Sequence, residues 1–321
     1  MMNWIKKTPA TLKLVRWPNL LMIVFIQLSL YYAIIYKLCK IAGVQNLLNN
    51  FDLLILVLTT VLISAAGYVI NDYFDMRADR INRPESMILG RKLDHRTGIF
   101  MHWVLNGVAL ILGIYLAWRT GSWKFGLLFP MIIMLLWLYS VKYKKTTFWG
   151  NLTVAFLAAL VVVIVWLFSF FMLSRQPDSF VAVAPYVGMI TKYFAVFAAF
   201  AFLLTFTREV IKDAEDIEGD RATGSFTLAV TYGIPVAKKV AMASTVLTLM
   251  GTIFVIISFA NLGMVRTFIY FSLAVFIPLV YILLLTAKAK EKSDFHWLST
   301  VLKLVMLAGV LGLQPIAMAI G

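Results

Sequence analysis

FDLLILVLTTVLISAAGYVI, residues 51–70, runs without a break into NDYFDMRADR, residues 71–80. The first segment is almost entirely apolar, and its roughly 20 residues are the length that a helix needs to cross a hydrocarbon core of about 30 Å. The second segment places aspartates at positions 72, 75 and 79, which lie along one face of a continuing helix. The junction predicts a membrane-spanning helix that ends in an acidic face.

The composition of the whole chain agrees with this interpretation. Of 321 residues, 62% are hydrophobic and 14% are charged, and the mean hydropathy is +0.88. Soluble domains are about 45–50% apolar and about 25% charged, so a water-soluble protein, a disordered chain and a nucleic-acid-binding domain are excluded. The single cysteine, Cys39, excludes an intrachain disulfide and a cysteine metal site. We predict one all-α, polytopic membrane domain over residues 1–321.

Apolar segments long enough to span a bilayer recur nine times. They lie near residues 17–36, 51–70, 99–118, 123–141, 148–173, 185–207, 233–259, 264–286 and 297–319. With the N-terminus in the cytoplasm, 22 of the 29 Lys and Arg residues fall on the cytoplasmic side, as the positive-inside rule requires. The same orientation predicts that two long charged loops, 71–98 and 208–232, are cytoplasmic. In a prokaryote the protein would lie in the inner membrane.

Those two loops hold 11 of the 15 acids, and their aspartates follow one pattern. Each loop carries a trio with i, i+3, i+7 spacing, and the second trio follows the first at an offset of 141 residues. The trios are Asp72, Asp75, Asp79 and Asp213, Asp216, Asp220. This spacing puts three carboxylates on one helix face at the cytoplasmic end of a span. A solvated charged loop is the alternative, but solvation does not require the spacing to repeat.

Like charges on one helix face repel each other, and poor solvation near a membrane increases the cost. Two such faces need a cation between them. Carboxylate oxygens suit Mg²⁺, which proteins hold with one or two carboxylates plus substrate phosphates. We predict that the six aspartates are both the metal ligands and the catalytic residues of a clamp for a magnesium diphosphate.

Polar and basic side chains near the trios are predicted to bind the remaining diphosphate oxygens. They are Asn71, Arg77, Tyr139, Lys144 and Lys212. The alternative for the basic residues is topology alone, because any cytoplasmic loop satisfies the positive-inside rule by carrying lysine and arginine.

At these residues the chain resembles the UbiA superfamily of intramembrane prenyltransferases. The family's first motif, Asn-Asp-x-x-Asp-x-x-x-Asp, is matched by residues 71–79, and its second, Asp-x-x-x-Asp, by residues 216–220. Residues 208–224 are most similar to the branch that makes digeranylgeranylglyceryl phosphate, with homogentisate and chlorophyll prenyltransferases as near relatives. After Asn82-Arg83-Pro84 the chain departs from the family pattern, because it lacks an arginine and two prolines over residues 85–90.

The resemblance implies nine helices around a central cavity, with cap loops after the second and sixth helices. It implies Mg²⁺-dependent transfer of a polyprenyl group from a polyprenyl diphosphate to a lipophilic acceptor in the lipid bilayer. Geranylgeranyl transfer to geranylgeranylglyceryl phosphate fits best, and an aromatic acceptor of the quinone, tocopherol or chlorophyll type is the alternative. A cation-coupled transporter is the rival from another class, although transporters tend to place such charges near the bilayer midplane.

Overall fold

The computed structural model describes residues 9–45, 47–82 and 84–320, so Arg83 lies outside the described residues. Within these ranges the chain is almost entirely helical and forms no β-strand. Nine helical segments in this part of the chain are long and apolar enough to span a membrane. The predicted all-α membrane fold with nine spans is confirmed.

The spans are Trp17–Ile41, Asn50–Asn82, His95–Thr120, Trp123–Lys145, Trp149–Ser174, Pro177–Glu215, Ile234–Asn261, Val265–Lys288 and Lys292–Ile320. Their helices and the short helices between them are α2 (Ala10–Leu14), α3 (Trp17–Leu30), η1 (Tyr31–Tyr36), α4 (Lys37–Ile41), α5 (Asn50–Asn82), α6 (His95–Thr120), α7 (Trp123–Gly126), α8 (Leu128–Val141), η2 (Tyr143–Lys145), α9 (Trp149–Ser174), α10 (Pro177–Glu215), α11 (Ile217–Ala222), α12 (Leu228–Tyr232), α13 (Ile234–Asn261), α14 (Val265–Phe271), η3 (Ser272–Phe276), α15 (Ile277–Lys288), α16 (Lys292–Leu311) and α17 (Leu313–Ile320). The segments η1 and η3 are π-helical turns, whereas η2 is a 3-10 turn.

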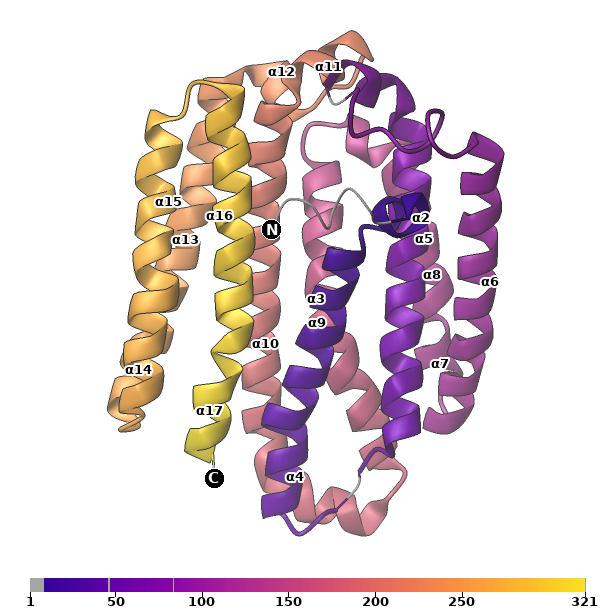
Figure 1. The fold of residues 1–321 in the computed structure, drawn as a ribbon. Coiled ribbons are helices and arrows are strands. Elements are labelled where there is room, and N and C mark those ends of the chain that lie inside the picture. Colours follow the sequence, from indigo (N-terminus) through magenta and orange to yellow (C-terminus); the bar gives the residue numbers. More distant parts are fainter. Residues whose placement is uncertain (1–8, 46, 83, 321) are drawn as a thin grey trace.

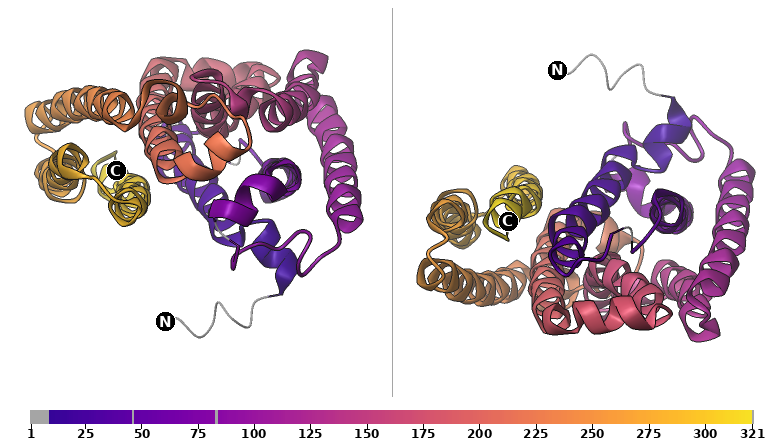
Figure 2. Two further views of the ribbon diagram at one scale, coloured as in Figure 1. Left: turned by 90° about the horizontal axis from the view of Figure 1, so that it is seen from above. Right: turned by 90° about the horizontal axis from the view of Figure 1, so that it is seen from below.

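The long helices run side by side in one bundle (Figure 1). Helices α5, α6 and α8 form one side, α13 to α16 form the other, and α3, α9 and α10 lie between them. Seen along the bundle axis, the helices from α3 to α10 form an irregular ring, and the C-terminal helices pack outside it (Figure 2). The short helices α11 and α12 and the turns between α5 and α6 cover one end of the bundle (Figure 1). We call this covered end the cap end.

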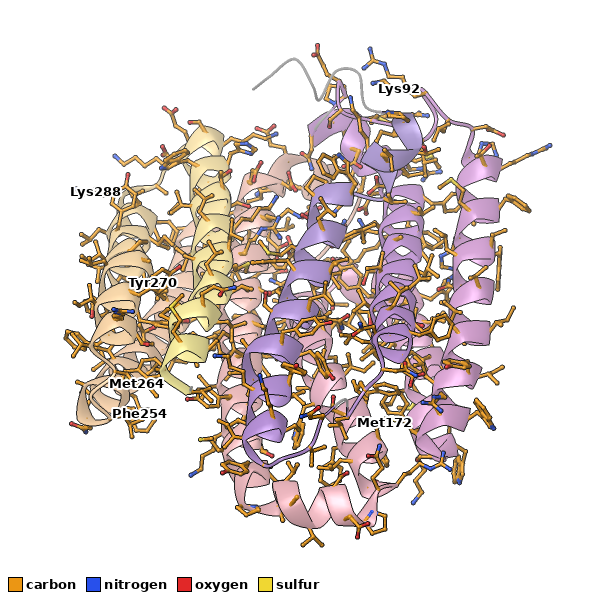
Figure 3. The ribbon with its side chains drawn as sticks, turned by 60° about the horizontal axis from the view of Figure 1, so that its bottom comes forward. Lys92, Met172, Phe254, Met264, Tyr270 and Lys288 are labelled. Carbon is orange, nitrogen blue, oxygen red and sulfur yellow. The ribbon has the colours of Figure 1, made fainter. Side chains whose placement is uncertain are left out.

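The outer surface of the bundle is apolar, as contact with lipid requires. Helix α6 exposes a row of large side chains: Phe100, Trp103, Ile111 and Ile114. The charged side chains of Lys92 and Lys288 lie at the cap end, whereas Met172 and Met264 lie toward the opposite end (Figure 3).

Helices α5 and α10 extend beyond the spans predicted at 51–70 and 185–207. They contain 33 and 39 residues, so at about 1.5 Å per residue they are about 50 Å and 58 Å long. Both exceed the hydrocarbon thickness of about 30 Å. The start of each predicted loop is helical because neither proline nor glycine interrupts residues 71–82 or 208–215. The helical extensions carry the acidic residues of the first trio and the start of the second.

The end of α5 opposite the cap is anchored by a buried charge. Asp52 is fully buried, and Arg119 of α6 binds it through two nitrogens, with Nη2 at 2.6 Å from Oδ2 and Nε at 2.9 Å from Oδ1. The hydroxyl of Tyr115 donates to the same carboxylate at 2.7 Å. The side-chain oxygen of Asn49 accepts a hydrogen bond from the Asp52 amide at the first turn of α5. This network fixes α5 against α6.

Removing the cation from this network should destabilise the fold. We expect Arg119→Met to lower the free energy of unfolding by about 2–4 kcal/mol, because a buried carboxylate would lose its partner. The Asp52→Asn/Arg119→Met double variant should recover part of that loss, and Arg266→Met, which changes an exposed arginine, should have little effect. Thermal unfolding of the purified protein in detergent measures all three. Equal melting temperatures for Arg119→Met and the wild type would show that the ion pair does not stabilise the bundle.

Candidate active site

A cavity of about 990 Å³ extends from the cap end into the middle of the bundle. This volume is at the upper end of the range for small-molecule sites. Five of the six predicted aspartates line the cavity: Asp75, Asp79, Asp213, Asp216 and Asp220. The wall below them is apolar and comes from α3, α5, α9, α10, α13 and α16. The cavity combines an acidic head with a hydrophobic body.

The first acidic trio is on α5 and is held by residues from other parts of the chain. Asn71 is buried and donates from Nδ2 to Asp75 Oδ2 at 2.8 Å. The ammonium of Lys144, from the short η2 turn, forms an ion pair with Asp75 and lies 3.4 Å from Asn71 Oδ1. Tyr139 on α8 also lines the cavity, and Asp79 lies one turn beyond Asp75 on the same face. Three of the predicted diphosphate ligands thus surround Asp75.

Asp72 is not among the residues that line the cavity, and it binds Arg16, which lines it. The Nη2 of Arg16 donates to Asp72 Oδ1 at 2.7 Å, and the guanidinium carbon lies 5.1 Å from the centre of the Tyr68 ring. The backbone of Arg16 has φ = 52°, which is the left-handed region that a side chain other than glycine adopts at a cost. This conformation turns the chain between α2 and α3 and directs Arg16 toward the cavity, which it lines.

The second trio lies at the junction of α10 and α11. Asp213 accepts a hydrogen bond from Asn151 Nδ2 at 2.9 Å, and Asp216 occupies the turn at which α10 ends. Burial raises the pKa of Asp220 to about 6; Lys144 opposes this rise, whereas Asp216 and Asp75 add to it. Carboxylates of both trios are therefore close enough to repel each other across the head of the cavity.

Asn82, at the end of α5, connects the helix of the first trio to the turn of the second trio through two hydrogen bonds. Its Nδ2 donates to the Asp216 carbonyl at 3.1 Å, and its Oδ1 accepts from the Gly219 amide at 2.9 Å. A Cβ atom at position 219 would lie 2.3 Å from Asn82 Nδ2, so a larger residue would displace the Asn82 side chain from its hydrogen bonds. We call this pair of hydrogen bonds the Asn82 latch. It attaches the end of α5 to the turn that carries the second trio.

The cap is also tied to the segment that carries Lys144. The amide of Phe226 donates to the Lys145 carbonyl at 2.9 Å, and the hydroxyl of Thr147 donates to the Phe226 carbonyl at 3.0 Å. At the start of α16, His296 lies 3.0 Å from a carboxylate oxygen of Glu215. The cap therefore contacts α5 and the segment between η2 and α9, and the end of α10 next to the cap contacts α16.

Of the remaining predicted ligands, Lys212 lines the cavity, with its ammonium 3.9 Å from Glu209. Arg77 is exposed and is not among the residues that line the cavity. Sequence reasoning missed Asn82, although it continues the face of Asn71, Asp75 and Asp79 by one further turn. It counted Arg16 only toward topology, because a contact across 56 residues leaves no trace in local spacing.

The carboxylates suit a hard cation, but they do not form a metal site by themselves. Among the described residues, no group of three or more His, Cys, Asp or Glu side chains could hold a metal ion. Mg²⁺ is usually bound by one or two carboxylates together with substrate phosphate oxygens and water. The repelling carboxylates around Asp220 fit that arrangement, in which phosphate oxygens of a substrate complete the coordination of the metal.

Comparisons with known proteins agree with this architecture. The family model described as the UbiA prenyltransferase family matches residues 34–307. The digeranylgeranylglyceryl phosphate synthase of Methanosphaera stadtmanae is 29% identical over 262 residues, which are 80% of this chain and 85% of the relative.

Two solved structures share the fold. One, described as giving insights into the biosynthesis of digeranylgeranylglyceryl phosphate synthase in membranes, has a TM-score of 0.61 at 23% identity and covers 95% of this chain and 97% of its own. The other, a UbiA homolog from Archaeoglobus fulgidus bound to GPP and Mg²⁺, has a TM-score of 0.53 at 14% identity and covers 95% of this chain and all of its own.

The Asn82 latch makes a prediction about coupled substitutions. Asn82→Ala alone should lower the free energy of unfolding by about 2 kcal/mol through the loss of two hydrogen bonds. Gly219→Ala alone should also lower it, because the added methyl group clashes with Asn82. In the double variant, Gly219→Ala should cost less than it does alone, because the added methyl group meets no Asn82 side chain.

A double-mutant cycle of melting temperatures tests the latch. Gly107→Ala serves as the control, since a Cβ there meets no atom within 4 Å. Strictly additive losses from Asn82→Ala and Gly219→Ala would contradict the steric coupling.

Proposed function

The chain belongs to the UbiA prenyltransferase family, and we propose that it transfers a geranylgeranyl group from geranylgeranyl diphosphate to geranylgeranylglyceryl phosphate. It is an integral membrane prenyltransferase. One observation carries the proposal: two acidic motifs from α5 and α10 meet at the head of a large apolar cavity inside a membrane bundle. A diphosphate with a long isoprenoid tail fits this cavity, because its diphosphate can bind at the acidic head through Mg²⁺ and its tail can lie against the apolar wall.

The donor diphosphate would lie between the two trios. Lys144 and Tyr139 lie beside Asp75 on one side, and Lys212 lies beside Asp213 on the other. All six aspartates and Asn71 are our candidates for the magnesium–diphosphate site, with Asp72 acting through its contact to Arg16. Bound Mg²⁺ would neutralise the negative charge that develops on the departing diphosphate. Arg77 is not needed in this arrangement.

The apolar wall would hold the isoprenoid tail and keep water away from the reacting carbon. In the reaction, the C1–O bond of the donor breaks and its electron pair leaves with the diphosphate. The acceptor hydroxyl oxygen forms the new bond to C1, and its proton leaves with the diphosphate. Lys144, which forms an ion pair with Asp75, is positioned to exchange that contact for a diphosphate oxygen.

The cap segments have a supporting role in this proposal. An allylic carbon with cationic character reacts with water unless the site is shielded. Helices α11 and α12 cover the end of the bundle above the trios (Figure 1), and the Asn82 latch ties them to α5. We assign residues 76–98 and 214–227 to this shield within one prenyltransferase domain.

The proposed orientation places the cap end in the cytoplasm. Lys92 and Lys288 lie at this end (Figure 3), and the basic loop that contains Lys144 also belongs to it. The positive-inside rule favours the cytoplasm for such an end. In a prokaryotic cell the enzyme would lie in the inner membrane, with both substrates supplied within the bilayer.

A transfer assay with the purified protein tests the reaction. Geranylgeranyl diphosphate, Mg²⁺ and geranylgeranylglyceryl phosphate should give the diether product, identified by mass spectrometry, and chelation of Mg²⁺ should abolish it. Asp216→Asn should lower kcat by at least about 100-fold, since it removes a carboxylate proposed to hold the Mg²⁺ that stabilises the departing diphosphate. Asp178→Asn, which changes an exposed acid in the first turn of α10, is the matched control.

Other outcomes distinguish the alternatives. A product formed only with an aromatic acceptor such as homogentisate would move the chain to the aromatic branch of the family. Full activity of Asp216→Asn would remove the magnesium–diphosphate clamp. Absence of transfer to every acceptor, together with cation uptake into proteoliposomes, would favour a transporter.

A further inference from the structure

A cluster of cations lies in the same cavity, outside the two aspartate motifs. It consists of Arg208 on α10 and Lys303 on α16, and it borders Lys212 of the donor site. We propose that this cluster binds the phosphate of the acceptor lipid, so that it, and not the aspartate site, selects a phosphorylated acceptor. The inference rests on the proposed function, and it names the residues that recognise the second substrate.

The pattern of residues around α10 separates the two sites. Thr205, Arg208 and Lys212 are spaced i, i+3, i+7 and share one helix face, whereas Glu209, Asp213 and Asp216 share the adjacent face with i, i+4, i+7 spacing. Because α16 packs along α10, Lys303 joins the basic face. The two faces are related by about 100° of rotation, which puts an anion site next to the donor site.

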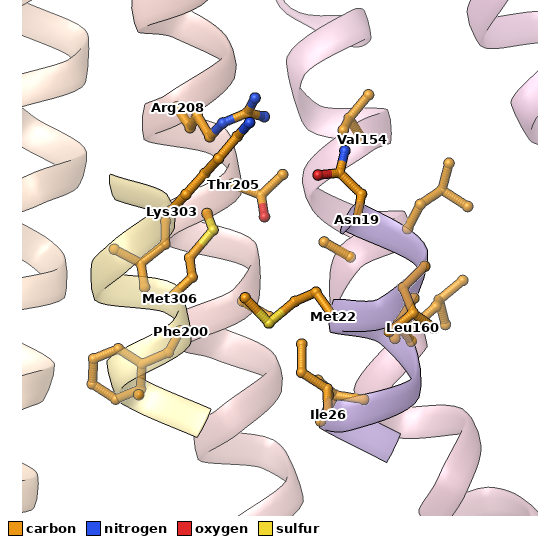
Figure 4. A pocket seen from close by; sticks show the side chains of 18 of the residues that line it. Asn19, Met22, Ile26, Val154, Leu160, Phe200, Thr205, Arg208, Lys303 and Met306 are labelled. Carbon is orange, nitrogen blue, oxygen red and sulfur yellow. The ribbon is translucent and has the colours of Figure 1, made fainter. Parts of the chain in front are cut away.

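Lys303 is placed as an anion ligand would be. It lies 11 residues beyond the start of α16, about 16 Å along the helix from the cap end. Its side chain rises toward Arg208 on α10 (Figure 4). Among the residues that the structure describes, no hydrogen-bond or ion-pair partner lies within reach of its ammonium. A lysine that faces other cations in a membrane-embedded cavity needs an anion to offset the repulsion.

Arg208 adds a second positive charge. Its Nη1 binds Glu209 Oε1 at 2.8 Å, which fixes the guanidinium. Its Nε is buried and has no hydrogen-bond acceptor in the described part of the chain. Because this nitrogen is closed to the cavity, Arg208 contributes its positive charge to the cluster, and it does not offer Nε as a contact.

The charge of the cluster suits an anionic group such as a phosphate monoester. Glu209 binds Arg208, whereas Lys303 has no carboxylate within ion-pair distance among the described residues, so its positive charge remains to be offset. A phosphate monoester carries about −1.5 to −2 charges at pH 7. A neutral aromatic acceptor would leave this charge unpaired.

The surroundings of the cluster suit an amphiphile. Met22 and Ile26 of α3, Phe200 of α10 and Met306 of α16 lie below the cations (Figure 4). This apolar tract accommodates a lipid chain that continues from the phosphate-bearing headgroup. On α10, Arg208 is five residues from Asp213, a rise of about 7.5 Å, so a hydroxyl next to the bound phosphate can reach the donor carbon below the aspartates.

Steady-state kinetics with four proteins tests the assignment. Lys303→Met should raise the KM for geranylgeranylglyceryl phosphate about tenfold or more, the effect of one lost charge-assisted contact. It should leave kcat and the KM for geranylgeranyl diphosphate within twofold of the wild type. Lys303→Arg should restore most of the acceptor affinity. Lys288→Met, which removes an exposed charge from the same end of the molecule, should change nothing (Figure 3).

Two further measurements separate the possible ligands. With geranylgeranylglycerol, which lacks the phosphate, the wild type and Lys303→Met should have the same kcat/KM. In the absence of the donor, geranylgeranylglyceryl phosphate should raise the melting temperature of the wild type and raise that of Lys303→Met less, because only binding to the folded state stabilises it.

The outcomes distinguish this inference from the proposed function. An unchanged acceptor KM in Lys303→Met, with normal transfer by the wild type, would overturn the phosphate site and leave the function intact. An increase in the KM for geranylgeranyl diphosphate instead would assign the cluster to the donor and also overturn it. A Lys303-dependent thermal shift without any transfer would support the phosphate site and refute the proposed reaction.

Discussion

The structure depends on one physical requirement, the neutralisation of carboxylates at the poorly solvated ends of membrane-spanning helices. Three of the predicted aspartates have a partner from another part of the chain. Asp72 binds Arg16 before α3, Asp75 binds Lys144 after α8, and Asp213 accepts from Asn151 on α9. Since an unpartnered charge is costly there, these contacts hold together the ends of five helices, α3, α5, α8, α9 and α10. The same rule applies to Asp52 at the other end of α5.

The length of α5 and α10 determines where the acidic residues lie relative to the membrane. Because both helices exceed the hydrocarbon thickness, their acidic turns stand at the edge of the bilayer while their apolar turns line the cavity. An amphiphilic substrate can therefore keep its tail in an apolar environment and its charged group among polar side chains at the same time. The Asn82 latch spans the two helix ends, so the positions of the trios depend on each other.

Helical periodicity explains what could be predicted from the sequence. The nine spans follow from the length of apolar segments, and the common face of Asp75 and Asp79 follows from their spacing. Contacts between helices distant in sequence have no such signature. The pair of Arg16 and Asp72 depends on a left-handed backbone at Arg16, and the approach of Lys303 to Arg208 depends on how α16 packs against α10. Glu209 was counted among the loop acids, yet its role becomes visible only when its two cationic neighbours are placed.

Glu209 shows how one helix can serve two anions without merging their sites. It lies on the acidic face of α10 but binds Arg208 and extends toward Lys212, both of which belong to the basic face. Its negative charge stands between the position proposed for the diphosphate and that proposed for the acceptor phosphate, and it would repel either anion from the boundary. Helix α10 thus has an acidic face and a basic face, with Glu209 in contact with both. This arrangement allows two anionic headgroups to bind at neighbouring positions, one beside each face.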